Sequence, residues 1–249
     1  MARRAGASGS TETAPGAAAD GPAAEPRPHY HDHRQRLRER FLGGDGEAFS
    51  DYELLELLLF FAIDRIDVKP LAKALLAEFG SLGAVLAAEP ARLRRFERVS
   101  ERTLALFKAM RETSRRCLRE ELAAKPVISS WTALLDYCRA SLAHESTERF
   151  RVLFLDRKNR LIADELQQRG TIDQAPVYPR EVIRRALDLG ATALILVHNH
   201  PSGDPTPSQA DIAITREVRD AAGTMGIVLH DHVVVGTGGT ASMKGLGLI

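Results

Sequence analysis

The residues of this chain that could act together in chemistry lie in one short stretch, VHNHPSGDPTPSQAD, at 197–211. It continues an apolar run, ATALILV, that predicts a buried strand. Alternate side chains of a strand share a face, so His198 and His200 project together. The later polar residues predict a helix start, where Ser208 and Asp211, three apart, are neighbours. The turn formers between them can fold the helix start back to the strand end, so that two ring nitrogens and a carboxylate converge.

Two histidines and one carboxylate, with a fourth position left to water, form the ligand set of hydrolytic zinc sites. In such sites zinc lowers the pKa of water to about 7 and supplies a nucleophile at neutral pH. Non-haem iron takes the same kinds of ligand, so residue types alone leave iron open. A structural alternative also stays open, because Ser208 and Asp211 fit the capping box that begins many helices. An HxH pair at a strand end can likewise be an ordinary polar rim, and the conjunction of the two motifs is what favours a metal site.

The sequence from Glu148 onward predicts a compact α/β layer that would hold these residues. Four stretches have the alternating or continuous apolar pattern of strands, and two have apolar residues at helical spacing. The order is strand, strand, helix, strand, helix, strand, with a hairpin around Lys158 and Asn159. We expect strands in ERFRVLFLD, RLIADELQQ, ATALILVHNH and IVLHDHVVVG, and helices in PREVIRRALDLG and SQADIAITREVRDAAGTMG.

The preceding half of the chain divides into a tail, a helical domain and a linker. Residues 1–28 contain no Leu, Ile, Val or Phe, so they predict a disordered tail that cannot offset the entropy of ordering. Residues 29–120 have helical patterns throughout. Residues 121–126, ELAAKP, end at a proline and are the expected linker. The α/β domain would then occupy residues 127–249.

Three helices of the helical domain have recognisable ends. Ser50 and Glu53 fit a capping box before a strongly apolar helix. Gly80 is the expected stop of a second helix. A third should run from about Glu101 to Arg119.

The composition narrows the class of protein. A net charge of +1 excludes a chain that is polybasic as a whole. The two cysteines, Cys117 and Cys138, form no CxxC pair, which argues against a disulfide framework and a thiolate zinc finger. No apolar run reaches membrane-spanning length, and the first residues contain no signal-like apolar segment. We therefore expect a soluble cytoplasmic protein with no membrane partner.

The stretch HNHPSGDPTPSQAD matches the JAMM pattern, in which two histidines are followed by seven residues, a serine, two residues and an aspartate. It resembles the JAB/MPN metalloproteases and, more closely, the bacterial RadC family. Members of that family carry HNHPSGDP with a following PS and D, and then DH in the next strand, here Asp231 and His232. The resemblance includes YPREVIRRAL, LFLDRKNRLI, RLRERFL, SDYELLELLL and EFGSL, and so covers about residues 34–249.

The resemblance implies a fold, a cofactor and an activity. The fold would be an α/β JAB/MPN-like domain, layered like a cytidine deaminase, after a small all-α helix-hairpin-helix-like domain. His198, His200 and Asp211 would be the ligands of one zinc ion per chain. Ser208 would stabilise the oxyanion on the attacked carbonyl. The reaction would be zinc-dependent hydrolysis of a peptide or isopeptide-like amide bond in a protein or peptide substrate.

JAMM enzymes also use a glutamate from an earlier element as a general base. The matching residue is Glu148, although a solvated charge at a strand entry fits it too. Its rival is Glu181, which follows Pro179 in the first turn of a helix, where the helix dipole explains an acidic residue.

Other polar groups have weaker patterns. Asp231 and His232 alternate along their strand, so at most one can face the site, either as a partner of a metal-bound histidine or as half of an ordinary edge pair. His29 and His33 are one helical turn apart and could bind stray metal, although such a run is typical of a solvated helix start. The sequence lacks the PCxxC half of a zinc-deaminase signature and the GxSxG elbow of a serine hydrolase.

A basic stretch raises a hypothesis of another class, a DNA-associated repair or recombination factor in which zinc is only structural. Residues 92–119 contain ten Lys or Arg and three acidic residues, enough for phosphate contacts if one face gathers them. RadC relatives carry a helix-hairpin-helix-like region here, with a glycine-rich turn against a phosphate. This chain has RFERVSERT instead, so Arg98 and Ser100 flank a turn with less backbone freedom. Glu148 separates the hypotheses, because a structural zinc does not need it.

Overall fold

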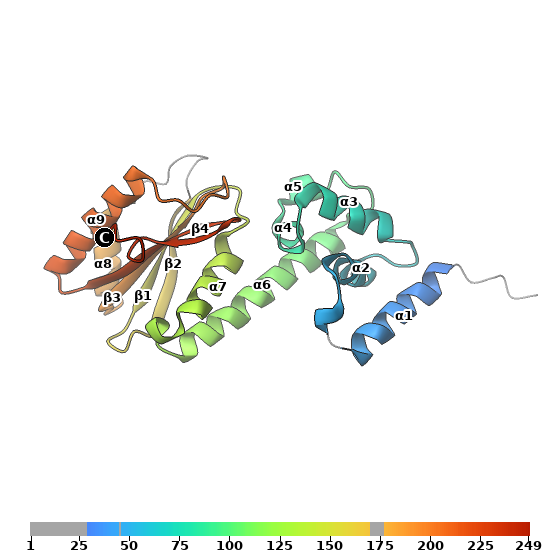
Figure 1. The fold of residues 1–249 in the computed structure, drawn as a ribbon, viewed down its shortest axis with the longest axis horizontal. Helices are drawn as coiled ribbons and strands as arrows, with labels where there is room; N and C mark the ends of the chain where they lie inside the picture. The colour runs from blue at the N-terminus through green and yellow to red at the C-terminus, as the bar shows by residue number, and fades with distance from the viewer. Residues whose placement is uncertain (1–28, 45, 170–176) are drawn as a thin grey trace, which may run out of the picture.

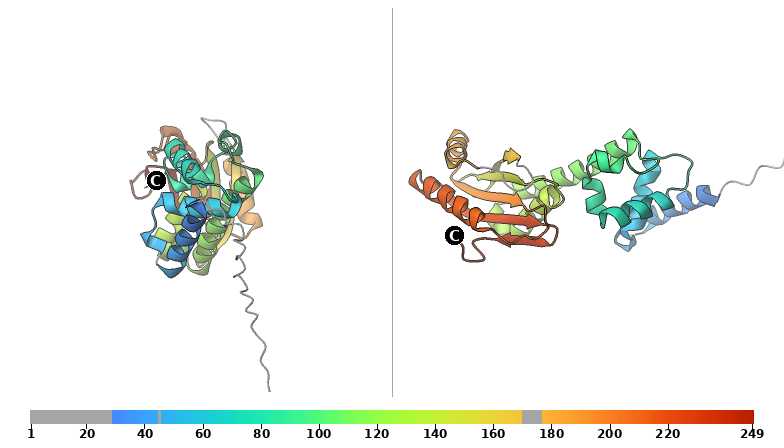
Figure 2. Two further views of the ribbon diagram at one scale, coloured as in Figure 1. Left: turned by 90° about the vertical axis from the view of Figure 1, so that its right-hand side faces the viewer. Right: turned by 90° about the horizontal axis from the view of Figure 1, so that it is seen from above.

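The computed structural model describes residues 29–44, 46–169 and 177–249, which form two lobes (Figure 1). A helical lobe and an α/β lobe lie at opposite ends of the long helix α6 (Glu101–Ala124), which belongs to both (Figure 2). The tail predicted for residues 1–28 lies outside the described residues. No helix in the described ranges is long and apolar enough to cross a membrane.

The helical lobe packs short helices around an apolar core that includes Leu55, Leu59 and Leu75. The capping box of Ser50 and Glu53 is present, as predicted. The helices before α6 are α1 (His29–Gly43), η1 (Gly46–Ala48), α2 (Asp51–Ala62), α3 (Lys69–Phe79), α4 (Leu82–Ala87) and α5 (Pro90–Leu93). Gly80 ends α3 with a φ of 85°, the left-handed conformation that glycine adopts without strain.

Helix α6 is longer than the predicted third helix and includes most of the segment predicted as a linker. It does not end at Arg119 but continues to Ala124, so that most of residues 121–126 is helical. Glutamate, leucine and alanine are strong helix formers, and Leu122 is fully buried in the core beneath the sheet. The helix ends before Pro126 because a proline disfavours helical backbone conformation at the residue that precedes it.

The α/β lobe is a five-stranded mixed sheet in the order β2-β1-β3-β4-β5. β1 is antiparallel to β2 and β3, β3 is parallel to β4, and β4 is antiparallel to β5. The strands are β1 (Arg149–Leu155), β2 (Leu161–Arg169), β3 (Ala193–Asn199), β4 (Val228–Gly236) and β5 (Gly239–Ser242), with the helices η2 (Val127–Ser130), α7 (Trp131–Leu142), α8 (Pro179–Asp188) and α9 (Gln209–Thr224). The predicted order is confirmed, whereas α7 and β5 are additional elements.

Helices cover both faces of the sheet (Figures 1 and 2). Leu194 and Leu196 of β3 pack with α8 and α9, whereas Ile195 and Val197 pack with α7 and the end of α6. The alternation of β3 therefore directs His198 to the α8 and α9 side and the next residue to the opposite side.

Candidate metal centre

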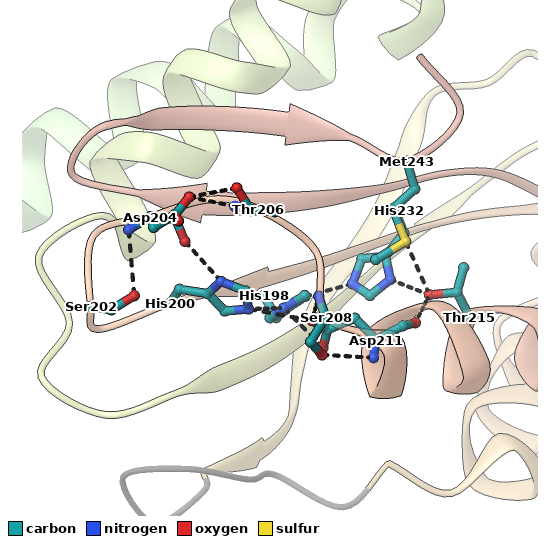
Figure 3. A network of polar contacts seen from close by, with 10 residues as sticks. All are labelled: His198, His200, Ser202, Asp204, Thr206, Ser208, Asp211, Thr215, His232 and Met243. Carbon is teal, nitrogen blue, oxygen red and sulfur yellow. Dashed lines mark hydrogen bonds and ion pairs between the residues drawn. The ribbon is translucent and has the colours of Figure 1, made fainter. Parts of the chain in front are cut away.

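The two predicted motifs converge at the end of β3 (Figure 3). The ligand atoms of His198, His200 and Asp211 all lie within 4.8 Å of one another. The two Nε2 atoms are 2.9 Å apart, and they lie 3.2 and 3.4 Å from the Asp211 carboxylate oxygens. These three form the one group of this kind among the residues that the structure describes.

The turn after β3 brings the helix start back across the sheet. The backbone N–H of His200 donates to the Val235 carbonyl at 2.9 Å, and that of Gly203 donates to the His200 carbonyl at 3.0 Å. Gly203 has a φ of 90°. A Cβ added at Gly236 would lie 2.2 Å from the Gly203 carbonyl oxygen. The close crossing of these two backbone segments therefore requires glycine at both positions.

The capping box that the sequence offered as the alternative to a metal site is present. Ser208 Oγ accepts from the Asp211 backbone N–H at 3.1 Å, and Asp211 Oδ2 accepts from the Ser208 N–H at 2.7 Å. Asp211 Oδ1 lies towards His198, at 3.2 Å from its Nε2. The same residues thus begin α9 and present a carboxylate to the two histidines.

The Nε2 atoms of His198 and His200 and the Asp211 carboxylate lie so close together that a positive charge is needed between them. His200 Nδ1 lies 2.9 Å from the Asp204 carbonyl, which only accepts, so this nitrogen carries the proton and a neutral ring presents a lone pair at Nε2. Burial would raise the pKa of Asp211, but the imidazoles of His198 and His200 beside the carboxylate hold that pKa well below its ordinary value. The hydrogen bond to Asp211 raises the pKa of His200. A proton on His200 or a metal cation can fill this position, and the two nitrogens and one oxygen fit zinc.

The β1 register places Glu148 beside this group. Phe150 pairs with His198 across the two strands, and their rings stack with centroids 6.1 Å apart. Glu148 precedes β1 by one residue, and a continuation of the same register would set it opposite His200 and on the same face. After Asp211, the charge of Glu148 contributes to the raised pKa of His200.

Glu181, the rival glutamate, lies in the first turn of α8 and pairs with Arg184 at 2.8 Å and with Arg180 at 3.5 Å. These ion pairs agree with a surface charge at a helix start. Glu148 lies near enough to His200 for its charge to act on that ring, and its role as a general base stays a prediction.

Asn199 holds the segment that carries Glu148. Its Oδ1 accepts from the Arg149 backbone N–H at 2.9 Å, and its Nδ2 donates to the carbonyls of Thr147 at 3.2 Å and Glu145 at 3.4 Å. Asn199 is 1% exposed. The alternation of a strand directs Asn199 away from His198 and His200, and a polar residue inside an apolar strand is a signal of such a structural role.

Of the two residues in the DH pair, His232 is the one that faces the site. Its Nε2 lies 2.7 Å from His198 Nδ1, whereas the Asp231 carboxylate accepts from the Lys244 N–H at 2.9 Å and from the Ser242 hydroxyl. This agrees with the expectation that at most one of the pair faces the metal group. Thr215, fully buried behind His232, was not found from the sequence.

Of the histidine pair His29 and His33, the structure describes the contacts of His33, and they are structural. Its Nε2 lies 2.8 Å from a carboxylate oxygen of Glu56, which is 1% exposed on α2. His33 thus packs α1 against α2, and the side chain of His29 lies outside the described residues.

The mixed sheet with its two histidines and an aspartate is the arrangement expected of a JAB-like domain, and the comparison with known families agrees. Residues 128–248 match the family model described as a RadC-like JAB domain. The chain is 61% identical over 213 residues to a UPF0758 protein of Rhodobacter capsulatus, covering 86% of this chain and 100% of that protein. It is 53% identical over 221 residues to a UPF0758 protein of Ruegeria pomeroyi, covering 89% of this chain and 99% of that protein. The chain belongs to the RadC family, as its motifs predicted.

Proposed function

We propose that this protein is a metal-dependent hydrolase of peptide or isopeptide-like amide bonds, with His198, His200 and Asp211 as the ligands of one zinc ion. The observation that carries the proposal is the convergence of three ligand atoms within 4.8 Å. Bound zinc would supply a Lewis acid and an activated water. The JAB class of domain is often hydrolytic, which agrees with this chemistry.

The reacting bond would be handled by two residues beside the metal. Glu148 takes a proton from the attacking water, whose oxygen bonds to the carbonyl carbon, and returns that proton to the nitrogen as the carbon–nitrogen bond breaks. Ser208 Oγ already accepts from the Asp211 N–H at 3.1 Å, so its own proton is free to point outward. Because Ser208 is exposed, that hydroxyl can donate to the oxyanion of the substrate.

The test uses the full chain loaded with zinc and a library of tryptic peptides from a whole proteome, with new termini detected by mass spectrometry. We expect cleavage by the wild-type protein and none by Glu148→Gln, with unchanged zinc content in both. Glu181→Gln is the matched control, because it removes an acid from α8 and should cleave as the wild type does. Wild-type rates in Glu148→Gln would contradict the role of that residue. Zinc-loaded wild-type protein that cleaves no peptide would count against the proposed hydrolysis.

A DNA-associated role is the second candidate, and the turn before α6 favours it. Arg98 has a φ of 73°, so this turn has a left-handed residue of the kind that glycine usually supplies. Ion pairs act against this role by occupying cations needed for phosphates. Within residues 92–119, side chains with a carboxylate partner are Arg92, Arg94, Arg98, Arg102, Arg111, Arg115 and Arg116.

Salt-dependent retention on immobilised duplex DNA separates the two candidates. Retention at low salt that disappears when Arg92, Arg94, Arg95 and Arg98 are all changed to Gln would support the accessory role. No retention of the wild-type chain at low salt would remove it.

A further inference from the structure

A buried chain of polar contacts runs behind His198 (Figure 3). His198 Nδ1 lies 2.7 Å from His232 Nε2, and His232 Nδ1 lies 2.5 Å from Thr215 Oγ1. Thr215 Oγ1 lies 2.5 Å from the backbone carbonyl of Asp211, and 3.5 Å from Met243 Sδ. The side chains of His198, Thr215 and His232 are fully buried. Bulk water therefore does not contact these three side chains.

The position of each proton follows from the carbonyl at the end of the chain. Two oxygen or nitrogen atoms at 2.5 Å need a proton between them. The Asp211 carbonyl has none to give, so the single hydroxyl proton of Thr215 points towards it. The contact between Thr215 and His232 then needs its proton from His232 Nδ1.

The proton on His232 Nδ1 in turn determines the tautomer of His198. The ring nitrogens of His232 face a hydroxyl and another imidazole. His232 is fully buried, and burial disfavours a charged ring that has no counter-charge against it, so the ring is neutral and has one N–H. That proton is on Nδ1, so Nε2 accepts from His198 Nδ1–H. A neutral His198 then has its lone pair on Nε2, the nitrogen that lies 3.2 Å from Asp211 Oδ1.

We propose that Thr215 and His232 are positioning residues that hold His198 in its Nδ1–H tautomer, with Nε2 ready to bind a divalent cation. The inference rests on the proposed function in taking that cation to be zinc. The Thr215 hydroxyl contacts both the histidine that supports one ligand and the backbone of Asp211, another ligand. One side chain thereby orients ligands from β3 and α9 together. Such partners of metal-binding histidines typically change metal affinity by about 10- to 100-fold.

A role in packing alone predicts the opposite order of substitutions. Thr215→Val keeps the shape of the side chain and removes the hydroxyl. Thr215→Ser keeps the hydroxyl and removes a methyl group from a fully buried position. If Thr215 only fills space, valine is the better replacement, and if it fixes the tautomer, serine is.

The experiment measures zinc affinity of the full chain by competition with a chromophoric chelator. We expect Thr215→Val to bind zinc about 10- to 100-fold more weakly than the wild type, and Thr215→Ser to stay within about threefold. A nitrogen-15 histidine spectrum of the zinc-free wild-type protein should assign His198 as the Nδ1–H tautomer, and Thr215→Val should lose this preference.

Several results would overturn the inference. Unchanged zinc affinity in Thr215→Val, or an equal loss in both variants, would leave the hydroxyl without this role. An Nε2–H tautomer of His198 in the wild-type spectrum would contradict the proton positions directly, and it needs no folded variant. A wild-type chain that binds no zinc would be a failure of the proposed function, and the spectrum would still test the chain of hydrogen bonds.

Discussion

Helices α2 and α9 begin with the same local motif and lie in different surroundings. At α2, the Ser50 N–H donates to Glu53 Oε2 at 3.1 Å, and the Glu53 N–H donates to Ser50 Oγ at 3.4 Å. At α9, the reciprocal bonds between Ser208 and Asp211 are 2.7 and 3.1 Å. Both serines cap a helix and both acids complete a capping box.

The difference lies in the second oxygen of each carboxylate. In Glu53 it pairs with Arg40, whose side chain is 54% exposed. In Asp211 it lies 3.2 Å from Nε2 of His198, whose side chain is fully buried. A capping box therefore says where a helix begins, and the neighbouring strand decides whether its acid joins a site. Substitutions of Ser50 and Glu53 in α2 are therefore matched controls for substitutions of Ser208 and Asp211 in α9.

The largest effect is expected for removing the charge of the acid in each box. Asp211→Asn should weaken zinc binding by more than about 100-fold, because a neutral amide is a poor zinc ligand. Glu53→Gln should leave zinc affinity unchanged. Chelator competition on both full-length variants measures this, and equal zinc affinities would show that Asp211 is only a cap.

Removing each serine should separate capping from chemistry. Ser208→Ala and Ser50→Ala should each lower the free energy of unfolding by about 1 kcal/mol, because each leaves a backbone N–H without its acceptor. Only Ser208→Ala should also lower kcat, by about 100-fold or more, if its hydroxyl donates to the oxyanion. The measurements are chemical denaturation and peptide turnover, and full turnover in Ser208→Ala would remove Ser208 from the mechanism.

A further variant should disturb the crossing that brings β3 to α9. Gly236→Ala places a Cβ 2.2 Å from the Gly203 carbonyl oxygen, and we expect a loss of about 2 kcal/mol in unfolding free energy with weaker zinc binding. Gly223→Ala is the control within α9, because a Cβ there meets nothing within 4 Å. Chemical denaturation should show a neutral or small stabilising effect for this control, and equal losses in both variants would refute the account of the crossing.

The smallest effect concerns the turn before α6. At Arg98, with a φ of 73°, Arg98→Gly should be more stable than Arg98→Ala by about 1 kcal/mol. Arg94, with a φ of −64°, should show the reverse order. Thermal denaturation of the four variants measures this, and alanine being the more stable replacement at Arg98 would contradict the left-handed turn.

Local sequence patterns predicted the helices and strands in which polar and apolar side chains recur at regular spacing. The alternation of β3, the capping box of α9 and the positions of His198, His200 and Asp211 follow from spacing along the chain. Strand β5, GTAS, was missed because four residues with small side chains do not form a recognisable alternation of polar and apolar residues. Helix α6 was predicted to end too early because burial of Leu122 depends on the sheet above it.

The contacts of His232 and Thr215, which lie behind His198, could not be identified from the sequence. These contacts depend on strand register and helix packing, which one sequence does not specify. His232 meets His198 because β4 lies parallel to β3, with Leu196 opposite His232. Thr215 meets His232 only because α9 packs over that strand. Such contacts join segments from three elements, so they could be found only from the folded structure.

The most direct test of the central claim is the metal content of the freshly purified, tag-free full chain, measured by inductively coupled plasma mass spectrometry. His198→Ala and Asp211→Ala are measured beside it, with His33→Gln as a control histidine outside the site. We predict about one zinc per chain in the wild type and in His33→Gln, and none in the other two. Folded wild-type protein that contains no metal and takes up no added zinc would contradict the account and leave Ser208 and Asp211 as a helix cap alone.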